Sequence, residues 1–474
     1  MKQNKIIICI ILICIVTIFS CKKEQLFTEP DNSISDIDAY SNASRIDKSA
    51  TGMYDQLQNS NFFGGRILVY TDQRALDANQ SSFFGEMGKF TTLTANDGIV
   101  AGGYQGGYRT IYQANLFYQS FLPNIGLVPA AKADQYIGES KYIRALCYFY
   151  LVNLWAQPYG FTPDNSHLGV PLVITASTDP FDPSNNLPRS TVKQVYDQME
   201  SDLLDAEIKL PASYPDAFTQ VARATKGSAR ALLSRLYLYK ADYAKANTYA
   251  DLVISSGKYA LQSDPKTVFT AYTSTESISS VAMSGGDNPN TNNSLGQHYG
   301  INPGRGDINV TTDYIKLMDT TVDKRYKNLI KIFSGSFWST KYPGLTVDYV
   351  PIIRYAEVLL IKAEALARLT TTLPATPVFI QAQALVQQVR DRSSGGSLGI
   401  LTSQQQLIDA TIKEKRIELA FEGQNYLDIQ RAKLDLPAHG FVTSVIPSGD
   451  KLRVLPIPTY DIQKNPNLVQ NPGY

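Results

Sequence analysis

The stretch ATKGSARALLSRLYLYKADYAKANTYADLVISSG, residues 224–257, decides the fold. Its first half places apolar residues at the i, i+3, i+4, i+7 spacing of an amphipathic helix. These residues are Ala229, Leu232, Leu233, Leu236 and Tyr237. After a short break at 242–243 the same spacing returns over 246–254, and Gly257 favours a helix end there because glycine tolerates the left-handed conformation. The stretch therefore predicts two helices joined by a tight turn.

Small residues in the first helix, namely Gly227, Ala231 and Ser234, allow a neighbouring helix backbone to approach closely. Two amphipathic helices of this length with small contact residues predict a tetratricopeptide-like hairpin. A second pair of helices follows the same pattern over 356–367 and 379–389, with a longer linker at 370–377. Each hairpin leaves an apolar face that only another hairpin can cover, so further helical units are expected.

Further helices are predicted from the same spacing over 111–121, 192–210 and 404–421, and residues 142–155 are apolar on nearly all sides. An all-round apolar helix indicates a buried central element. Long irregular stretches rich in Gly, Asn and Pro lie between the helices, with a strand-like alternation at 277–283. Loops of this length in a compact domain are usually functional.

The predicted fold is therefore mainly α, with a tetratricopeptide-like helical hairpin scaffold and a loop-rich, mostly irregular second lobe. We expect residues 1–20 to be a signal peptide and residues 21–474 to form a single domain. The scaffold is expected over about 21–58, 108–260 and 350–474. The loop-rich lobe is expected over about 59–107 and 261–349.

The N-terminus predicts export and lipid attachment. Lys2 and Lys5 precede an apolar run of 14 residues, 6–19. A helix of that length spans roughly 21 Å, which is short of a hydrocarbon core of roughly 30 Å, so it indicates a signal peptide. The run meets Ser20 and Cys21 without an A-x-A site and resembles a bacterial lipobox, which predicts lipid attachment at Cys21. The alternative is a soluble secreted protein that is cleaved nearby.

Composition narrows the function. Removal of residues 1–20 leaves 454 residues and changes the formal charge from +1 to −1, and the absence of a basic block argues against nucleic-acid binding. Only Cys147 remains besides Cys21, so neither a disulfide framework nor a cysteine metal site is expected. The 29 Tyr and 19 Phe suit surfaces that offer an apolar face beside a hydroxyl.

Three motifs could carry other chemistry. Residues 395–399 fit the G-x-S-x-G pattern of a hydrolase elbow, but that elbow requires a preceding strand and a following helix, so a linker is favoured. The asparagines over 288–292 alternate as calcium ligands do, although most features of a calcium loop are missing and a solvated turn is favoured. Arg416 lies on the apolar stripe of its helix, which predicts a buried ion pair with Glu364 or Glu357 and a scaffold role.

Several segments in a fixed order resemble the SusD/RagB family of Bacteroidota lipoproteins. They are the lipobox start, YIRALCYFYLV at 142–152, QPYG at 157–160, GVPL at 169–172, RYAEVLL at 354–360, IKEKRIELAFEG at 412–423, YLDIQR at 426–431, LPIP at 455–458 and NPNLVQNPGY at 465–474. The set covers nearly the whole chain. The resemblance is therefore to the full SusD-like fold.

This resemblance implies a non-enzymatic binding protein of the outer membrane, held by fatty acids such as palmitate and facing the cell surface. Its implied partner is a SusC-like TonB-dependent transporter, which it caps as a hinged lid, and its cargo is an oligosaccharide. In some relatives the cargo is a peptide, which stays open as the alternative. A surface glycoside hydrolase and a scaffold that docks other proteins are rival readings. No cofactor and no metal are expected.

Carbohydrate binding needs aromatic rings that stack on the C–H face of a sugar and polar side chains that meet its hydroxyls. Such sites are open and lie on loops held by a rigid frame. Tyr104 and Tyr108 stand before a predicted helix, where the family often has ligand-facing tryptophans. Trp338 with Phe337, and Tyr299 with Arg305, lie in predicted loops. These six residues are the predicted ligand-binding set, although each ring could instead pack inward.

Overall fold

A computed structural model describes residues 38–370 and 376–474 of the chain. The predicted signal peptide and Cys21, the predicted lipid-attachment residue, lie outside the described residues. Within the described ranges no helix is both long enough and apolar enough to cross a membrane.

The chain divides into two compact units, Met1–Ser49 and Ala50–Tyr474. The described part of the first unit holds η2 (Asp38–Tyr40) and the first turns of α2 (Ala43–Leu57), where Arg45 forms an ion pair with Asp38 at 3.3 Å. Both of these side chains are exposed, so the pair contributes little to stability. The predicted division into a signal peptide and a single domain stays a prediction.

Most helices of the second unit form the scaffold. They are α3 (Arg66–Gln73), α4 (Gly98–Phe121), α5 (Ala130–Trp155), α6 (Val192–Lys209), α7 (Ala217–Ala222), α8 (Lys226–Tyr239), α9 (Tyr243–Ile254), α13 (Tyr355–Leu369), α14 (Pro377–Arg392), α15 (Gln404–Leu419), α16 (Asn425–Arg431) and α17 (Thr459–Lys464). Shorter helices interrupt the loops. They are α10 (Leu295–Tyr299), α11 (Thr312–Ile315) and α12 (Lys324–Leu329).

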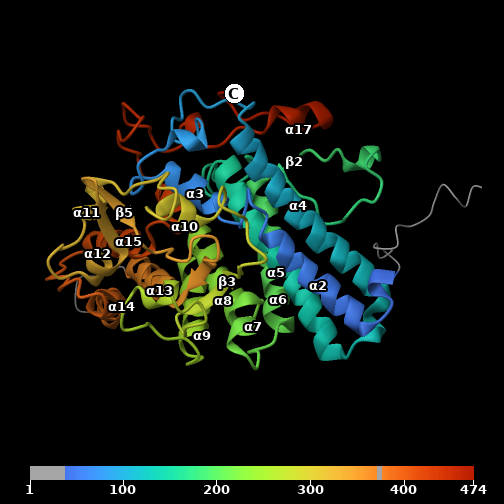
Figure 1. Cartoon of the computed structure of the whole chain (residues 1–474), viewed down its shortest axis with the longest axis horizontal. Coiled ribbons are helices and arrows are strands. Elements are labelled where there is room, and N and C mark those ends of the chain that lie inside the picture. Colours follow the sequence, from blue (N-terminus) through green and yellow to red (C-terminus); the bar gives the residue numbers. More distant parts are fainter. Residues whose placement is uncertain (1–37, 371–375) are drawn as a thin grey trace, which may run out of the picture. The chain divides into compact units, whose positions relative to one another are not determined.

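The helices pack in a continuous series, and the predicted mainly α fold class is confirmed (Figure 1). Helix α5 contacts α4 and α6, and α6 contacts α8. The predicted hairpins are α8 with α9 and α13 with α14, and α13 also contacts α8, α9 and α15. Every residue from Tyr142 to Trp155 is buried, which confirms the predicted central helix.

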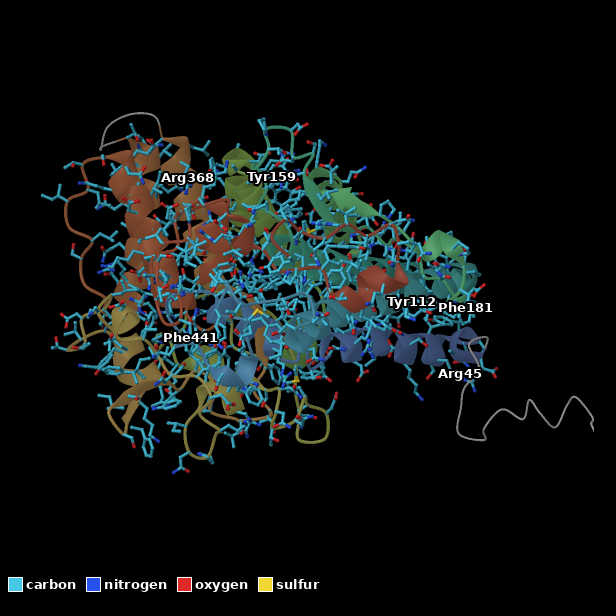
Figure 2. All side chains as sticks on the ribbon, turned by 90° about the horizontal axis from the view of Figure 1, so that it is seen from above. Arg45, Tyr112, Tyr159, Phe181, Arg368 and Phe441 are labelled. Atoms are coloured by element: carbon cyan, nitrogen blue, oxygen red, sulfur yellow. The ribbon has the colours of Figure 1, made fainter. Side chains whose placement is uncertain are left out.

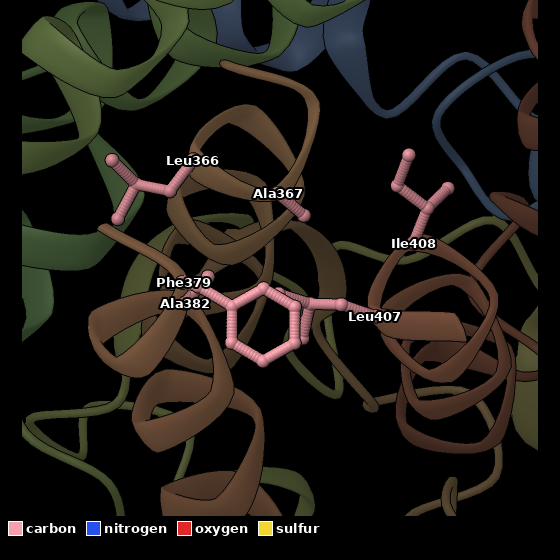
Figure 3. Close-up of a cluster of buried hydrophobic side chains, with 6 residues drawn as sticks. All are labelled: Leu366, Ala367, Phe379, Ala382, Leu407 and Ile408. Atoms are coloured by element: carbon pink, nitrogen blue, oxygen red, sulfur yellow. The ribbon is translucent and has the colours of Figure 1, made fainter. Parts of the chain in front are cut away.

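A cluster of buried apolar side chains shows how the second hairpin joins the next helix (Figure 3). Leu366 and Ala367 of α13 pack with Phe379 of α14 and with Leu407 of α15. Residues 367 and 379 belong to the apolar stripes that the sequence predicts. The third helix closes the face that the hairpin leaves open, as expected for stacked helical units.

The start of α4 differs from the prediction. The helix begins at Gly98 instead of residue 111, because the side chain of Asp97 accepts hydrogen bonds from the backbone N–H groups of residues 99 and 100 and caps the helix. The glycines of this segment permit close packing: a Cβ at Gly103 would lie 3.1 Å from the Tyr70 ring, and a Cβ at Gly107 would lie 2.9 Å from Leu151. With α3 also present, residues 59–107 are less irregular than predicted.

Three two-stranded antiparallel sheets complete the described fold. They are β1 (Leu168–Pro171) with β2 (Arg189–Thr191), β3 (Ser277–Val281) with β6 (Val350–Arg354), and β4 (Ile330–Phe333) with β5 (Ser336–Ser339). Strand β3 confirms the predicted strand, but all five of its residues are buried, so the two faces do not alternate in exposure. Its register pairs Ser277 with Arg354, the residue before α13, which places β3 beside the start of that helix.

Candidate functional site

The six predicted ligand residues fall in three separate places. Arg305 and Trp338 belong to one surface built from loops and the β4–β5 hairpin. Phe337 precedes Trp338 in β5 and therefore faces the opposite side of the strand. Tyr104 and Tyr108 line a groove beside α4. Tyr299 lies in the core. The predicted set is therefore not a single site.

The first place, here called the loop surface, consists of Arg66, Phe83, Asn292, Arg305 and Trp338. Phe83 is the last but one residue of η3 (Ser82–Phe84), and its ring is half-buried. The guanidinium of Arg305 lies over this ring at 4.3 Å from the ring centroid, and that of Arg66 lies at 5.7 Å. Such cation–π contacts orient both guanidiniums on one aromatic platform.

Hydrogen bonds fix both guanidiniums further. Arg305 donates from Nε to Asp307 at 3.0 Å and also donates to the side-chain oxygen of Asn292. Arg66 donates to the backbone carbonyl of Asn292 at 2.9 Å. Because the planar guanidinium offers five donors, these bonds leave N–H groups that can meet hydroxyls or carbonyls of a ligand.

A buried histidine lies beneath the loop surface. The His298 ring contacts the rings of Phe83 and Phe84 at 5.4 and 4.8 Å, and its Nδ1 lies 2.9 Å from Oδ2 of Asp307. Burial lowers the pKa of His298. Burial alone would raise the pKa of Asp307, but hydrogen bonds from His298 and Arg305 lower it below its usual value. At neutral pH a neutral His298 therefore donates to an ionised Asp307, whose charge offsets one of the two guanidiniums.

The β4–β5 hairpin brings Trp338 to the same surface. Its turn residues Ser334 and Gly335 both have positive φ, 47° and 76°, as tight hairpin turns require. Trp338 is half-buried and covers Gly306, where an added Cβ would lie 3.3 Å from the indole. Gly306 follows Arg305 in the chain and has a φ of 67°, so the indole lies against the backbone next to Arg305. The predicted loop position of Phe337 and Trp338 is wrong, because both belong to β5.

The second place is an open groove of about 1140 Å³ beside α4. Tyr104 and Tyr108 line it, but the prediction that they precede a helix is wrong because both lie inside α4. The Tyr104 side chain is only 3% exposed and contacts Trp155 at 5.5 Å between ring centroids. Tyr108 donates from its hydroxyl to the carbonyl of Pro171 at 2.8 Å. The two rings form the base of the groove.

The third place removes Tyr299 from any ligand surface. Tyr299 ends α10 and is 1% exposed, so the prediction that its ring is displayed on a loop is wrong. Its hydroxyl donates to Asp72 at 2.6 Å, and burial raises the pKa of Asp72 to about 8. The physical reason for the inward orientation is that this buried carboxyl group requires a hydrogen-bond partner.

The motifs that suggested other chemistry have structural roles. Residues 395–399 form a loop after α14, and Arg390 donates to the carbonyl of Gly396 at 3.0 Å, so the linker interpretation is confirmed. Asn288, Asn290 and Asn292 shape a turn, in which Asn288 donates to the carbonyl of Ser284 at 2.8 Å. Within residues 38–370 and 376–474, no three His, Cys, Asp or Glu side chains gather closely enough to hold a metal ion.

The partner predicted for Arg416 is wrong. Arg416 pairs with Asp77 at 2.7 Å, because α15 turns this side chain toward the segment that follows α3. Glu357 pairs instead with Arg235 at 2.7 Å, and Glu364 pairs with Arg431 at 2.6 Å. The scaffold role predicted for these groups is nevertheless the one they have, since every pair joins two elements of the fold.

Sequence reasoning missed Phe83 and Arg66 on the loop surface and Tyr112, Phe181 and Tyr460 on the groove. Phe83 stands among serines and a glycine, and Phe181 stands between prolines and aspartates, where no apolar periodicity marks a core position. The i, i+4 spacing of Tyr108 and Tyr112 would have placed both rings on one helical face once α4 was extended.

Comparisons with known proteins agree with this fold. A family model described as the SusD family matches residues 331–474, and one described as "Starch-binding associating with outer membrane" matches residues 26–238. The chain is similar to SusD-like protein P2 of Formosa agariphila, with 24% identity over the full length of both chains.

Solved structures show the same similarity. A SusD superfamily protein from Bacteroides fragilis has 28% identity and a TM-score of 0.79, and the match covers 91% of this chain and 100% of that chain. A SusD superfamily protein from Bacteroides vulgatus has 25% identity and the same TM-score, with 91% and 99% covered.

Proposed function

The chain belongs to the SusD/RagB family, and on that premise we propose that it binds oligosaccharides at the bacterial surface and passes them to a SusC-like TonB-dependent transporter as its lid. In this proposal Cys21 carries the fatty acids, so the folded body is anchored in the outer membrane but solvated. Two or more acyl chains anchor a protein stably, whereas one does not.

The observation that carries the proposal is the loop surface. Two guanidiniums are held over the Phe83 ring, and the half-buried indole of Trp338 lies against Gly306, the residue after Arg305. A pyranose can stack its C–H face on an aromatic ring while fixed N–H donors meet its hydroxyls. Rings and donors that are already positioned lose little conformational entropy when the ligand binds.

The same surface supports binding without cleavage. Glycoside hydrolysis requires two carboxyl groups about 5–9 Å apart that flank the scissile bond. The carboxylate of the loop surface, Asp307, is engaged by His298 at 2.9 Å and by Arg305 at 3.0 Å, and its lowered pKa makes it a poor proton donor. We therefore expect the bound glycan to leave unchanged.

A binding experiment with a polysaccharide panel tests the proposal. The full-length protein in detergent is run through native gels containing starch, xylan, galactomannan or pectin, alone and as Phe83→Ala and Trp338→Ala. We expect retardation by at least one polysaccharide and a loss of about tenfold in affinity for each variant. Phe441→Ala is the matched control, since this phenylalanine is 49% exposed and belongs to the 438–445 loop.

Three results would contradict the proposal. They are the absence of binding to every glycan together with binding to peptides, equal binding by wild type and both loop-surface variants, and the release of new reducing ends from a bound polysaccharide. The first would favour a peptide cargo, and the third would favour an enzyme.

A further inference from the structure

We infer that the groove beside α4 is a second carbohydrate-binding site, separate from the loop surface, which takes a stretch of uncharged oligosaccharide. The inference rests on the proposed function only in that the cargo is a glycan. The loop surface is built from η3, α10 and the β4–β5 hairpin, whereas the groove is built from α4, residues 171–187 and α17. The two surfaces share no residue.

The wall formed by residues 171–187 is held in place along α4. Asn115 donates to the carbonyl of Val173 at 3.0 Å. Gln119 both donates to the carbonyl of Ala176 at 3.2 Å and accepts from its N–H at 2.9 Å. The first half of this wall is therefore a preformed side of the groove, although its residues lie in no helix or strand after β1.

The opposite wall, α17 and the residues after it, is bonded to the far end of the same segment. Asn465 donates to the carbonyl of Leu187 at 2.8 Å, and Asn467 donates to that of Asn186 at 2.6 Å. Across the groove, Gln105 of α4 donates to Asp461 of α17 at 3.2 Å. Floor and walls are thus connected on three sides, and most binding pockets are preformed in this way.

Three aromatic rings border the groove and are exposed. Tyr112 is 40%, Tyr460 is 59% and Phe181 is 88% exposed, and Figure 2 shows Tyr112 and Phe181 at the same end of the molecule. The backbone around Phe181 is held by local hydrogen bonds. The N–H of Phe181 donates to the side chain of Asp179 at 2.9 Å, and Asn185 donates to the carbonyl of Asp179 at 2.7 Å. A local hydrogen-bonded turn therefore holds an apolar ring in water beside a groove.

The polar groups of the groove point to an uncharged ligand. Arg109 and Lys464 contribute two positive charges, and Asp182 and Asp461 contribute two negative charges, so the lining is balanced. Amide side chains of Asn and Gln supply paired donors and acceptors that match hydroxyl groups. Exposed aromatic rings together with amide side chains suit a neutral sugar chain. The loop surface differs because it has two guanidiniums and one carboxylate, and so one excess positive charge.

The size of the groove favours a chain over a single sugar. Its volume of about 1140 Å³ exceeds the roughly 300–1000 Å³ of small-molecule pockets, and it is open to solvent. An open groove allows a polymer to enter from the side. Two sites on one body would raise the avidity for a long glycan without raising the affinity for a short one.

The test compares groove variants with loop-surface variants on the same ligands. The full-length protein in detergent is titrated calorimetrically with oligosaccharides of two to eight units, made from any neutral polysaccharide that retards it in gels. We expect Tyr112→Ala with Tyr460→Ala, and separately Phe181→Ala, to weaken binding of the longest oligosaccharides about tenfold. Binding of the shortest ones at the loop surface should be unchanged, and Phe441→Ala should behave as wild type.

The outcomes separate this inference from the proposed function. If only Phe83→Ala and Trp338→Ala weaken binding at every length, the groove is not a glycan site and the inference fails while the proposed function stands. If the wild type binds no glycan, both fail. If the groove variants keep glycan affinity but lose co-purification with an outer-membrane transporter, the groove is a protein-docking face and the inference is overturned. Unchanged thermal unfolding midpoints show that the variants are folded.

Discussion

Charged groups occur in two contrasting settings, the buried ion network around α15 and the exposed loop surface. The network joins five cations to five carboxylates, and every side chain in it is at most 4% exposed except Arg390, which is 17% exposed and pairs with Glu414. Its members are Arg325, Lys341, Arg354, Arg390, Arg392, Asp323, Glu276, Glu414, Glu418 and Glu422. On the loop surface, by contrast, the Arg305 side chain is 30% exposed and lies over an aromatic ring.

The difference lies in what compensates each charge. In the network, Arg354 alone contacts Glu276 at 2.7 Å, Glu418 at 2.9 Å and Glu422 at 2.7 Å. Burial would raise the pKa of Glu418, but Arg392, Arg354 and Arg325 hold it well below its usual value. The network is internally satisfied and joins β6 and α12 to the scaffold, whereas the loop surface retains donors for a ligand. Arginine and acidic side chains thus stabilise the scaffold in the buried network and are available for ligand binding on the loop surface.

Removing one cation from the network should give the largest effect. Arg354→Met removes one cationic partner from each of three buried carboxylates, which keep only Arg392, Arg325 and Lys341. Breaking a buried ion pair costs about 3–5 kcal/mol. We expect the free energy of unfolding to fall by that amount in denaturant titrations. Arg109→Met, the same substitution at an exposed groove residue, should change it by less than about 0.5 kcal/mol. Equal losses of unfolding free energy in the two variants would contradict the proposed difference between the buried network and exposed charges.

Acid should weaken the buried ion pairs. Although burial opposes ionisation, Arg431 and neighbouring cations lower the pKa of Glu364 from 4.5 to about 2. A depressed carboxyl pKa gives stability that is present above the unfolded value and is lost as the pH falls. The contribution of Glu364 should therefore disappear between about pH 5 and pH 2, and amounts to roughly 3 kcal/mol.

The pH dependence of the Glu364 contribution is measured as the free energy of unfolding of wild type and Glu364→Gln at pH 7, 4 and 2.5. The stability gap between the two proteins should be widest at pH 7 and should narrow toward pH 2.5. A gap that stays constant over this range would show that Glu364 is not held ionised by its partners.

A conservative change on the loop surface should affect binding alone. Lysine keeps the charge of Arg305 but lacks the planar fork that stacks on Phe83 and donates to Asp307 and Asn292. We expect Arg305→Lys to weaken glycan binding about fivefold, with a change in unfolding free energy below about 0.5 kcal/mol. Calorimetric titration and thermal unfolding measure the two quantities. A large loss of stability would mean that the loop surface is part of the scaffold.

The smallest effect is expected at the G-x-S-x-G loop. Ser397 lies in the exposed linker between α14 and α15, away from both ligand surfaces. Ser397→Ala should leave glycan binding, stability and the level of reducing ends unchanged. If the wild type released reducing ends and the variant did not, this serine would have a catalytic role that the fold does not support.

Periodic segments could be predicted from the sequence, because burial imposes a spacing on helices that pack on one face. Both hairpins follow this rule, whereas the central helix could be predicted because it is apolar on nearly all sides and is buried throughout residues 142–155. The start of α4 could not be predicted, since its glycines favour loops locally and act in the fold by letting Tyr70, Trp155 and Leu151 approach. Tertiary packing therefore overrides the local preference at this helix.

The candidate site could be predicted only in part. The hairpin packs Trp338 against Gly306, next to Arg305 in the chain. Tyr299, in contrast, points inward to the buried carboxyl of Asp72, and no spacing in the sequence predicts that pair. Arg416 likewise finds Asp77, a residue 339 positions away in the chain. Long-range polar pairs of this kind depend on how the elements dock, which local patterns do not encode.

Hydrogen–deuterium exchange with and without a bound oligosaccharide tests most directly whether a rigid frame presents separate ligand surfaces. Protection should rise over residues 81–85, 292–307 and 336–339, and over 177–187 and 459–464 when a long oligosaccharide is used. Exchange in α13 and α15 should stay the same. Increased protection confined to α13 and α15, with none at the loop surface, would contradict this account.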